Sequence, residues 1–210
     1  MCGTEVLDKD GVSAAAVLGE LVAHLETEGL GLLQQLDRIY TEYGFHCSLN
    51  SYYLCHDPAT TAAIFSRIRG WPEGEAGPAG YPARLCGGRH AVVRVRDLTT
   101  GHDSGEPGQR ATLPVSSRYS ASPETGLRHI PQLTVCCVCS SQMITFWLEC
   151  GVVLTLRTSG TEPKLKYYTE YCAPPENKDW AGLQTQLGQI VTTVMEELFQ
   201  PKLNNLQPKP

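Results

Sequence analysis

Two stretches near the start of the chain carry apolar residues at helical spacing. The first follows Asp8 and Asp10, and either carboxylate can cap the exposed backbone N–H groups of a helix start. The second runs between Gly31 and Gly44, where the later glycine is placed to end the helix. The apolar positions of the two stretches are Leu18, Leu21, Val22, Leu25, Leu32, Leu36, Ile39 and Tyr43. No strand-rich segment precedes them, so residues 1–45 are predicted to be helices of a larger α/β/α unit.

From residue 46 the pattern changes to the alternation that is typical of strands. Strands are predicted over 46–55, 91–98, 141–149, 151–157 and 164–172, and helices over 58–69 and 177–199, with a Gly/Pro loop at 70–88. The last helix has its apolar stripe at Trp180, Leu183, Leu187, Val191, Val194 and Leu198. Residues 46–200 therefore predict an α+β domain, with helices packed on a mostly antiparallel sheet. The tail, 201–210, is too polar and proline-rich to fold alone.

Two of these predictions are specific enough to be tested: the faces of the strand over 91–98, and the turn between the strands over 141–149 and 151–157. Alternation places Ala91, Val93 and Val95 on one face of that strand, with Arg94 and Arg96 on the other. The two strands predicted over 141–149 and 151–157 are expected to form a hairpin that turns near Cys150 and Gly151.

Composition and charge exclude several classes of protein. The chain has 210 residues, of which 41% are hydrophobic and 19% are charged, and its formal net charge is −5. This balance argues against a nucleic-acid partner, which normally requires a basic face. The sequence has no apolar run of 18 residues, so no membrane partner is expected, and no signal peptide is visible.

The nine cysteines are spaced irregularly, and this pattern favours reduced thiols in a cytoplasmic protein. A Cys-x-x-Cys pair occurs within Cys136–Cys139, but no second pair or histidine partner lies at the spacing of a zinc site. The six histidines also lack ligand spacing. We therefore predict no metal site, and we expect these cysteines to be small apolar residues of a strand.

The turn between the last two predicted strands is unusually rich in hydrogen-bond donors. It presents Arg157, Thr158, Ser159, Gly160 and Thr161, whereas an ordinary hairpin needs only Gly or Asn. An arginine fork can bind two phosphate oxygens, and hydroxyl groups and bent backbone N–H groups can bind the others. A solvated turn with an incidental arginine explains the same residues, and the spacing alone does not decide between the two readings.

The run RTSGTEPKLKYY at 157–168 resembles the phosphate-binding loop in the C-terminal domain of the α-D-phosphohexomutases, which move phosphate between positions of one sugar. VLDKDGVSAA at 6–15 is similar to a segment at the end of the third domain of that family. RDLTTG at 96–101, SSQMITF at 140–146 and the LQPK tail look most like the phosphopentomutase branch, which also contains phosphoglucomutases and glucose-1,6-bisphosphate synthase. The resemblance covers nearly the whole chain and implies that 46–200 is a TATA-binding-protein-like domain.

The resemblance also implies roles for individual residues. Arg157, Ser159, Gly160 and Thr161 would hold the non-transferring phosphate of a phosphorylated pentose or hexose, and Thr158 would support the turn. In the family, binding of this phosphate lets a bisphosphorylated sugar reorient and present its other phosphate to the reacting group.

Three lysines are further candidates for contact with the substrate. Lys164 and Lys166 would raise the positive potential at the turn, although solvated strand lysines explain them equally well. Lys9 resembles a family lysine near the substrate, with an exposed lysine as the alternative. Asp10 is expected to cap a helix rather than act as a catalytic acid.

The sequence departs from the family pattern in its catalytic loops. It contains no Ser-His-Asn triplet and no Asp-x-Asp-x-Asp run, so no catalytic residue is assigned and no residue of this chain is expected to bind the Mg²⁺ of the family. We expect the C-terminal portion of a phosphosugar mutase, an intramolecular phosphotransferase. The alternative is a non-catalytic sugar-phosphate-binding module or an inactive truncated product.

A second departure is the segment 115–139, which lies where family members pass almost directly from Leu113–Pro114 into SSQMITF. It begins rich in Ser and Pro and then becomes apolar. A splicing or gene-prediction artefact is the favoured interpretation, with a regulatory insertion as the alternative. Residues 115–131 offer few apolar positions and are expected to be irregular.

Overall fold

The structure of the protein is a computed structural model that describes residues 10–106 and 142–210. Lys9 and the segment 115–139 lie outside these residues. The described chain forms two compact units. The first contains residues up to His46 together with Ala173–Lys178, and the second contains Cys47–Cys172 and Asp179–Pro210.

The first unit contains the helices α1 (Gly11–Thr27) and α2 (Leu32–Tyr43). Asp10 caps α1, as predicted, and its carboxylate accepts from the N–H groups of Val12 and Ser13 at 2.9 and 3.2 Å. These hydrogen bonds hold the pKa of Asp10 below its ordinary value. Gly44 ends α2 with a φ of 97°. Of the eight apolar positions predicted for these two helices, only Leu25 is buried. Val22 is half-buried, and the other six are 39–66% exposed.

The second unit is built on an antiparallel sheet, which confirms the α+β class. Its strands are β1 (His46–Ser48), β2 (Ser51–Leu54), β3 (Arg84–Leu85), β4 (His90–Asp97), β5 (His102–Asp103), β6 (Met143–Leu148), β7 (Val152–Thr158), β8 (Lys164–Cys172) and β9 (Gln207–Pro208). The strand order is β3-β4-β6-β7-β8-β2-β9, with β5 on β4 and β1 on β8. The turn at Gly151, with a φ of 88°, joins β6 to β7, as predicted.

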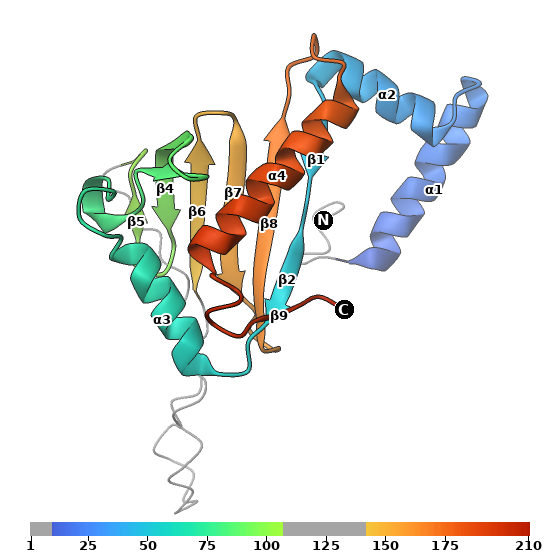
Figure 1. The fold of residues 1–210 in the computed structure, drawn as a ribbon. Coiled ribbons are helices and arrows are strands. Elements are labelled where there is room, and N and C mark those ends of the chain that lie inside the picture. Colours follow the sequence, from blue (N-terminus) through green and yellow to red (C-terminus); the bar gives the residue numbers. More distant parts are fainter. Residues whose placement is uncertain (1–9, 107–141) are drawn as a thin grey trace, which may run out of the picture. The chain divides into compact units, whose positions relative to one another are not determined.

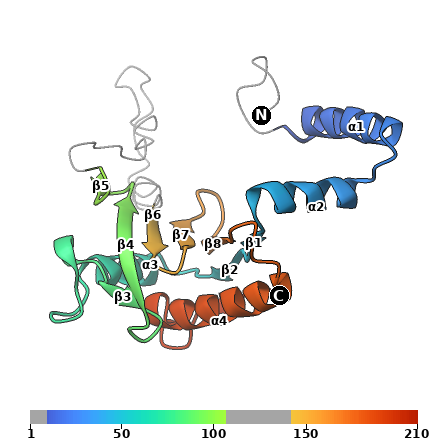
Figure 2. The ribbon, with the colours of Figure 1, turned by 90° about the horizontal axis from the view of Figure 1, so that it is seen from above.

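Two helices cover one face of this sheet. Helix α4 (Trp180–Leu198) runs diagonally across that face (Figures 1 and 2), and α3 (Pro58–Arg69) is tied to its end by Arg67, whose guanidinium donates to the carbonyls of Glu197 and Leu198. The predicted stripe of α4 is buried from Leu183 to Leu198, and Trp180 is half-buried. Alternate sheet residues meet these helices: Ile144, Phe146, Leu148, Leu154, Leu156 and Leu165 are at most 3% exposed. Among the described residues, no helix is long and apolar enough to cross a membrane.

The prediction for the face of Val93 is wrong. Val95 is 7% exposed, as a core residue should be, but Val93 is 62% exposed. The cause is an irregularity in the pairing of β4 with β6: Val92 lies opposite Leu148, and Arg94 lies opposite the next residue, Trp147. A β-bulge of this kind adds a residue to one strand and breaks strict alternation, so Val93 turns away from the core.

The single strand predicted over 46–55 is interrupted between Ser48 and Ser51. At the break, the Asn50 side chain accepts from the N–H of Thr169 at 3.0 Å, and Leu49 donates its N–H to the Thr169 carbonyl at 3.2 Å. A side chain therefore replaces part of the backbone ladder, and the chain re-enters the sheet as β2. At the C-terminus, β9 pairs with β2.

The other face of the sheet, which we call the polar face, carries a buried carboxylate. The Arg94 guanidinium donates to both oxygens of Asp103, at 2.9 and 2.7 Å, and lies 4.8 Å from the centre of the Trp147 ring. The Asp103 side chain is 7% exposed. The hydrogen bonds from Arg94 lower the pKa of Asp103 to about 2, in spite of the burial.

This low pKa predicts a contribution to acid stability. Because the folded pKa lies below the unfolded value, the stabilisation is present above about pH 4 and is lost as the pH falls towards 2. Since Arg94 is partly exposed, we expect about 1–2 kcal/mol. Urea denaturation between pH 2 and 6 measures it: the difference in unfolding free energy between wild type and Asp103→Asn should shrink by this amount on acidification. A difference that is independent of pH would contradict the assignment.

Candidate functional site

The turn singled out in the sequence joins β7 to β8 through residues 159–163. The N–H of Ser159 donates to the carbonyl of Lys164 at 2.9 Å, which closes the base of the turn. The N–H of Cys55 donates to the carbonyl of Pro163 at 2.8 Å, which ties the turn to the chain just after β2. Gly160 and Thr161 are exposed at the tip. The turn is therefore anchored at its base and open at its tip.

Arg157 and Lys166 are direct cross-strand neighbours on β7 and β8. Both alternate with buried core residues, so both side chains lie on the polar face. Like charges placed opposite each other repel, and this arrangement costs stability unless an anion lies between them. Within residues 10–106 and 142–210, neither cation forms an ion pair with a carboxylate. Arg94, Arg96 and Lys164 on the same face do form such pairs.

Lys164 is engaged within the turn. Its ammonium lies 2.6 Å from the Glu162 carboxylate and 4.5 Å from the centre of the Tyr52 ring. The hydrogen bond between the two side chains raises the pKa of Lys164 and lowers that of Glu162. The charge of Lys164 is thus largely matched by its neighbour, whereas Lys166 forms no salt bridge among the described residues and affects Glu162 only through its charge, which helps to lower the pKa of that carboxylate.

The two hydroxyl residues that follow Arg157 differ in their partners. Thr158 is 7% exposed, and its Oγ1 accepts from the N–H of Gln142 at 2.9 Å, so it supports the turn. Ser159 is 9% exposed, and its hydroxyl has no hydrogen-bond partner in the part of the chain that the structure describes. Because no buried side-chain oxygen of the described residues lacks a hydrogen-bond partner, the Ser159 hydroxyl oxygen is in contact with solvent, where it can donate to a ligand oxygen.

A small pocket of about 140 Å³ lies beside the turn. Its lining comes from the turn and from the connection that leads into α3, and consists of Cys55, His56, Pro58, Thr61, Thr158, Ser159, Glu162, Pro163, Lys164 and Leu165. The N-terminal N–H groups of α3 are already taken by the carboxylate of Asp57, which accepts from Ala59 and Thr60 at 3.0 Å. The residues from Cys55 to Thr61 were missed by the sequence analysis, since nothing in their spacing connects them with a turn a hundred residues later.

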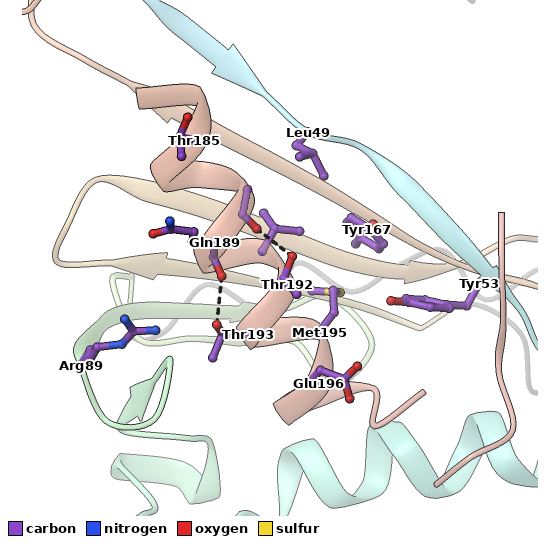
Figure 3. Close-up of a pocket in the computed structure, with 12 residues that line it drawn as sticks. Leu49, Tyr53, Arg89, Tyr167, Thr185, Gln189, Thr192, Thr193, Met195 and Glu196 are labelled. Atoms are coloured by element: carbon purple, nitrogen blue, oxygen red, sulfur yellow. Dashed lines mark hydrogen bonds between the residues drawn. The ribbon is translucent and has the colours of Figure 1, made fainter. Parts of the chain in front are cut away.

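A larger groove of about 690 Å³ follows α4 (Figure 3). Tyr53 and Tyr167 lie along one side of the helix, and Arg89 lies on the other. The hydroxyls of Thr192 and Thr193 along the helix donate to carbonyls one turn earlier, at 2.8 and 2.9 Å. Arg89 is the one cation among the described residues that line this groove, whereas the 157–166 hairpin carries Arg157 and Lys166 as cross-strand neighbours.

The chain matches known proteins along nearly its whole length. Glucose 1,6-bisphosphate synthase of Homo sapiens is 44% identical over 206 residues, which are 98% of this chain and 29% of that protein. Phosphopentomutase of Mus musculus is 44% identical over 209 residues, 100% of this chain and 29% of that protein. A probable phosphoribomutase of Schizosaccharomyces pombe is 34% identical over 99% of this chain. No protein-family model matches. The chain spans less than a third of the length of these relatives.

Proposed function

The chain is homologous to the C-terminal part of phosphohexomutase-type proteins, and from this relationship we propose that it is the phosphate-binding part of a phosphosugar mutase. Its ligand is the phosphate of a phosphorylated pentose or hexose. Relatives named phosphopentomutase, phosphoribomutase and glucose 1,6-bisphosphate synthase support a sugar phosphate as the ligand. The same proposal places the protein in the cytoplasm, in keeping with the reduced thiols of Cys47, Cys55, Cys86 and Cys150.

The observation that carries this proposal is the cross-strand pair of Arg157 and Lys166, which form no salt bridge among the described residues, on the hairpin that also presents the Ser159 hydroxyl to solvent. A phosphate dianion needs several donors to replace its water. The planar fork of arginine suits two phosphate oxygens, and a lysine ammonium supplies a second positive charge. Each charge-assisted hydrogen bond contributes about 1.5–3 kcal/mol. Three such donors on one rigid hairpin favour a phosphate over a carboxylate, which has only two oxygens to bind.

In a mutase, the hairpin would bind the phosphate that is not being transferred. Binding energy gained at that phosphate orients the distant hydroxyl or phosphate at the reacting end, which is how remote contacts accelerate a reaction. The Mg²⁺ ion of the family does not fit the turn. Magnesium requires oxygen ligands, but the single carboxylate there, Glu162, forms a salt bridge with Lys164 and is also acted on by the charge of Lys166. We therefore assign this chain the binding of the substrate phosphate and no step that involves the metal.

A titration followed by NMR tests the proposal. Addition of ribose 1-phosphate or glucose 1-phosphate to the labelled 210-residue chain should shift the amide signals of Ser159, Gly160 and Thr161. The dissociation constant should be in the millimolar range, because contacts with a single phosphate offset only part of the free-energy cost of association. Ribose without phosphate is the control and should leave these signals in place. Shifts concentrated at Gln189 and Thr192, or identical shifts with ribose, would contradict the proposal.

A further inference from the structure

A chain of hydrogen bonds, which passes through both the main chain and the side chain of Gln142, connects Thr158 with the end of α3. Gln142 exchanges two hydrogen bonds with Thr158: its N–H donates to Oγ1 at 2.9 Å, and its carbonyl accepts from the Thr158 N–H at 3.1 Å. The Gln142 side chain then accepts from the guanidinium of Arg69 at 2.6 Å. Arg69 is the last residue of α3. The residue between Arg157 and Ser159 is thus linked to the end of a helix.

The chain continues from Arg69 to a fully buried carboxylate. The Nε of Arg69 donates to Asp97 at 2.6 Å, and Asp97 is 0% exposed at the end of β4. Asp97 is itself held by the Tyr81 hydroxyl at 2.9 Å and by the N–H groups of Thr99 and Thr100 at 2.8 and 3.2 Å. Every acceptor position of this carboxylate is therefore used, and its location is determined by three separate segments of chain.

We infer that Gln142, Arg69 and Asp97 are positioning residues, which hold Arg157 and Ser159 at the spacing that a phosphate requires. The inference rests on the proposed function. None of the three is proposed as a ligand: they act through Thr158, which is buried and lies in the chain between Arg157, which is exposed, and Ser159. Two charge-assisted bonds on one planar guanidinium fix the direction of the Gln142 side chain, because both arms of the fork must be satisfied at once.

This arrangement has a specific consequence for binding. When the residues that support a binding site are loosened, its donor side chains remain in the same region but are no longer held at the right spacing. The site therefore binds its ligand with lower affinity. Breaking the link at Gln142 leaves the backbone bonds to Thr158, the buried core and the Arg69–Asp97 pair unchanged. The expected effect is therefore on phosphate affinity, with little effect on thermal stability.

Two variants break the link in different ways. Gln142→Met keeps the shape of the side chain but removes the acceptor, and Arg69→Lys keeps the pair with Asp97 but lacks the second arm of the fork. Both are expected to weaken binding of ribose 1-phosphate by about 10-fold, as misplacement of a supporting group does elsewhere. The matched control is Thr155→Val, which removes the 2.9 Å hydrogen bond between Thr145 and Thr155 across the same two strands. It should retain wild-type affinity.

Amide-shift titrations with ribose 1-phosphate and with inorganic phosphate, together with melting temperatures, give the outcome. Wild-type affinity in both variants, or an equal loss in Thr155→Val, overturns the inference. If a variant does not fold, hydrogen exchange on the wild-type chain decides: slow exchange at the Thr158 amide and the Arg69 Nε–H is expected, and fast exchange at both overturns it. Absence of phosphate binding by the wild-type chain contradicts the proposed function instead, so the two failures are distinguishable.

Discussion

Replacing Asp97 by alanine is expected to lower the free energy of unfolding by about 3–5 kcal/mol, because one partner of a buried ion pair is removed and the other is left without compensation. Asp97 is 0% exposed and neutralises Arg69, whose side chain is 22% exposed. The substitution also leaves the Tyr81 hydroxyl and the Thr99 and Thr100 N–H groups without their acceptor. Since an ordinary domain has an unfolding free energy of about 5–15 kcal/mol, such a loss removes most of the stability at the lower end of that range and at most about a third of it at the upper end.

Urea denaturation of the variant measures this loss, and Asp57→Ala is the matched control. Asp57 is also an aspartate that accepts from two backbone N–H groups, but it does so at the exposed start of α3, where a lost helix cap costs about 1 kcal/mol. A double variant with Arg69→Met separates the ion pair from the other contacts, and coupling between the two sites should be detectable. Equal losses in Asp97→Ala and Asp57→Ala would show that burial of this carboxylate is unimportant.

The elements that could be predicted from the sequence are those set by local signals. Asp10 before α1 and Gly44 after α2 lie where the apolar periodicity begins and ends, so both boundaries were placed correctly. The stripe of α4 repeats over five turns, and a helix is the only regular structure that puts such residues on one face. The hairpin at Gly151 was predictable because a left-handed φ favours glycine.

The features that were missed depend on partners far away in the sequence. The bulge that turns Val93 outward exists because of its register with β6, and no local residue marks it. The strand over 46–55 is interrupted because Asn50 reaches β8. The two-residue strands β3 and β9 carry too few residues to show any alternation. Long-range pairing thus overrides the local pattern in each case.

In the candidate site, too, the local features could be predicted from the sequence and the long-range ones could not. The cluster of donors from Arg157 to Thr161 was visible as a run of residues, but the sequence could not distinguish Lys164 from Lys166. Their difference is spatial: Glu162 forms a salt bridge with the ammonium of Lys164, whereas Lys166 acts on Glu162 only through its charge. The support through Gln142 was equally invisible, since it brings together the ends of α3, β4 and β7.

Arg157→Ala is expected to weaken the binding of ribose 1-phosphate or glucose 1-phosphate by about 10–100-fold, which corresponds to the loss of at least one charge-assisted hydrogen bond. The effect should exceed that of Lys166→Ala, because an ammonium is a flexible point charge, whereas the guanidinium offers a planar fork to two oxygens. For the same reason Arg157→Lys should recover only a small part of the affinity. Because Arg157 is exposed and lies opposite the like charge of Lys166, neither alanine variant should melt at a lower temperature than wild type, and Arg157→Lys should melt at the wild-type temperature.

The matched control is Arg84→Ala, which removes an equal charge from an arginine side chain that is 52% exposed on β3. The phosphosugar affinity of this variant should stay within about 2-fold of wild type at physiological salt, since charges separated by more than roughly 8 Å are screened there. Amide-shift titrations of the four variants measure the order. An equal loss in Arg84→Ala and Arg157→Ala would mean that general positive charge attracts the ligand, and the hairpin would then no longer qualify as its binding site.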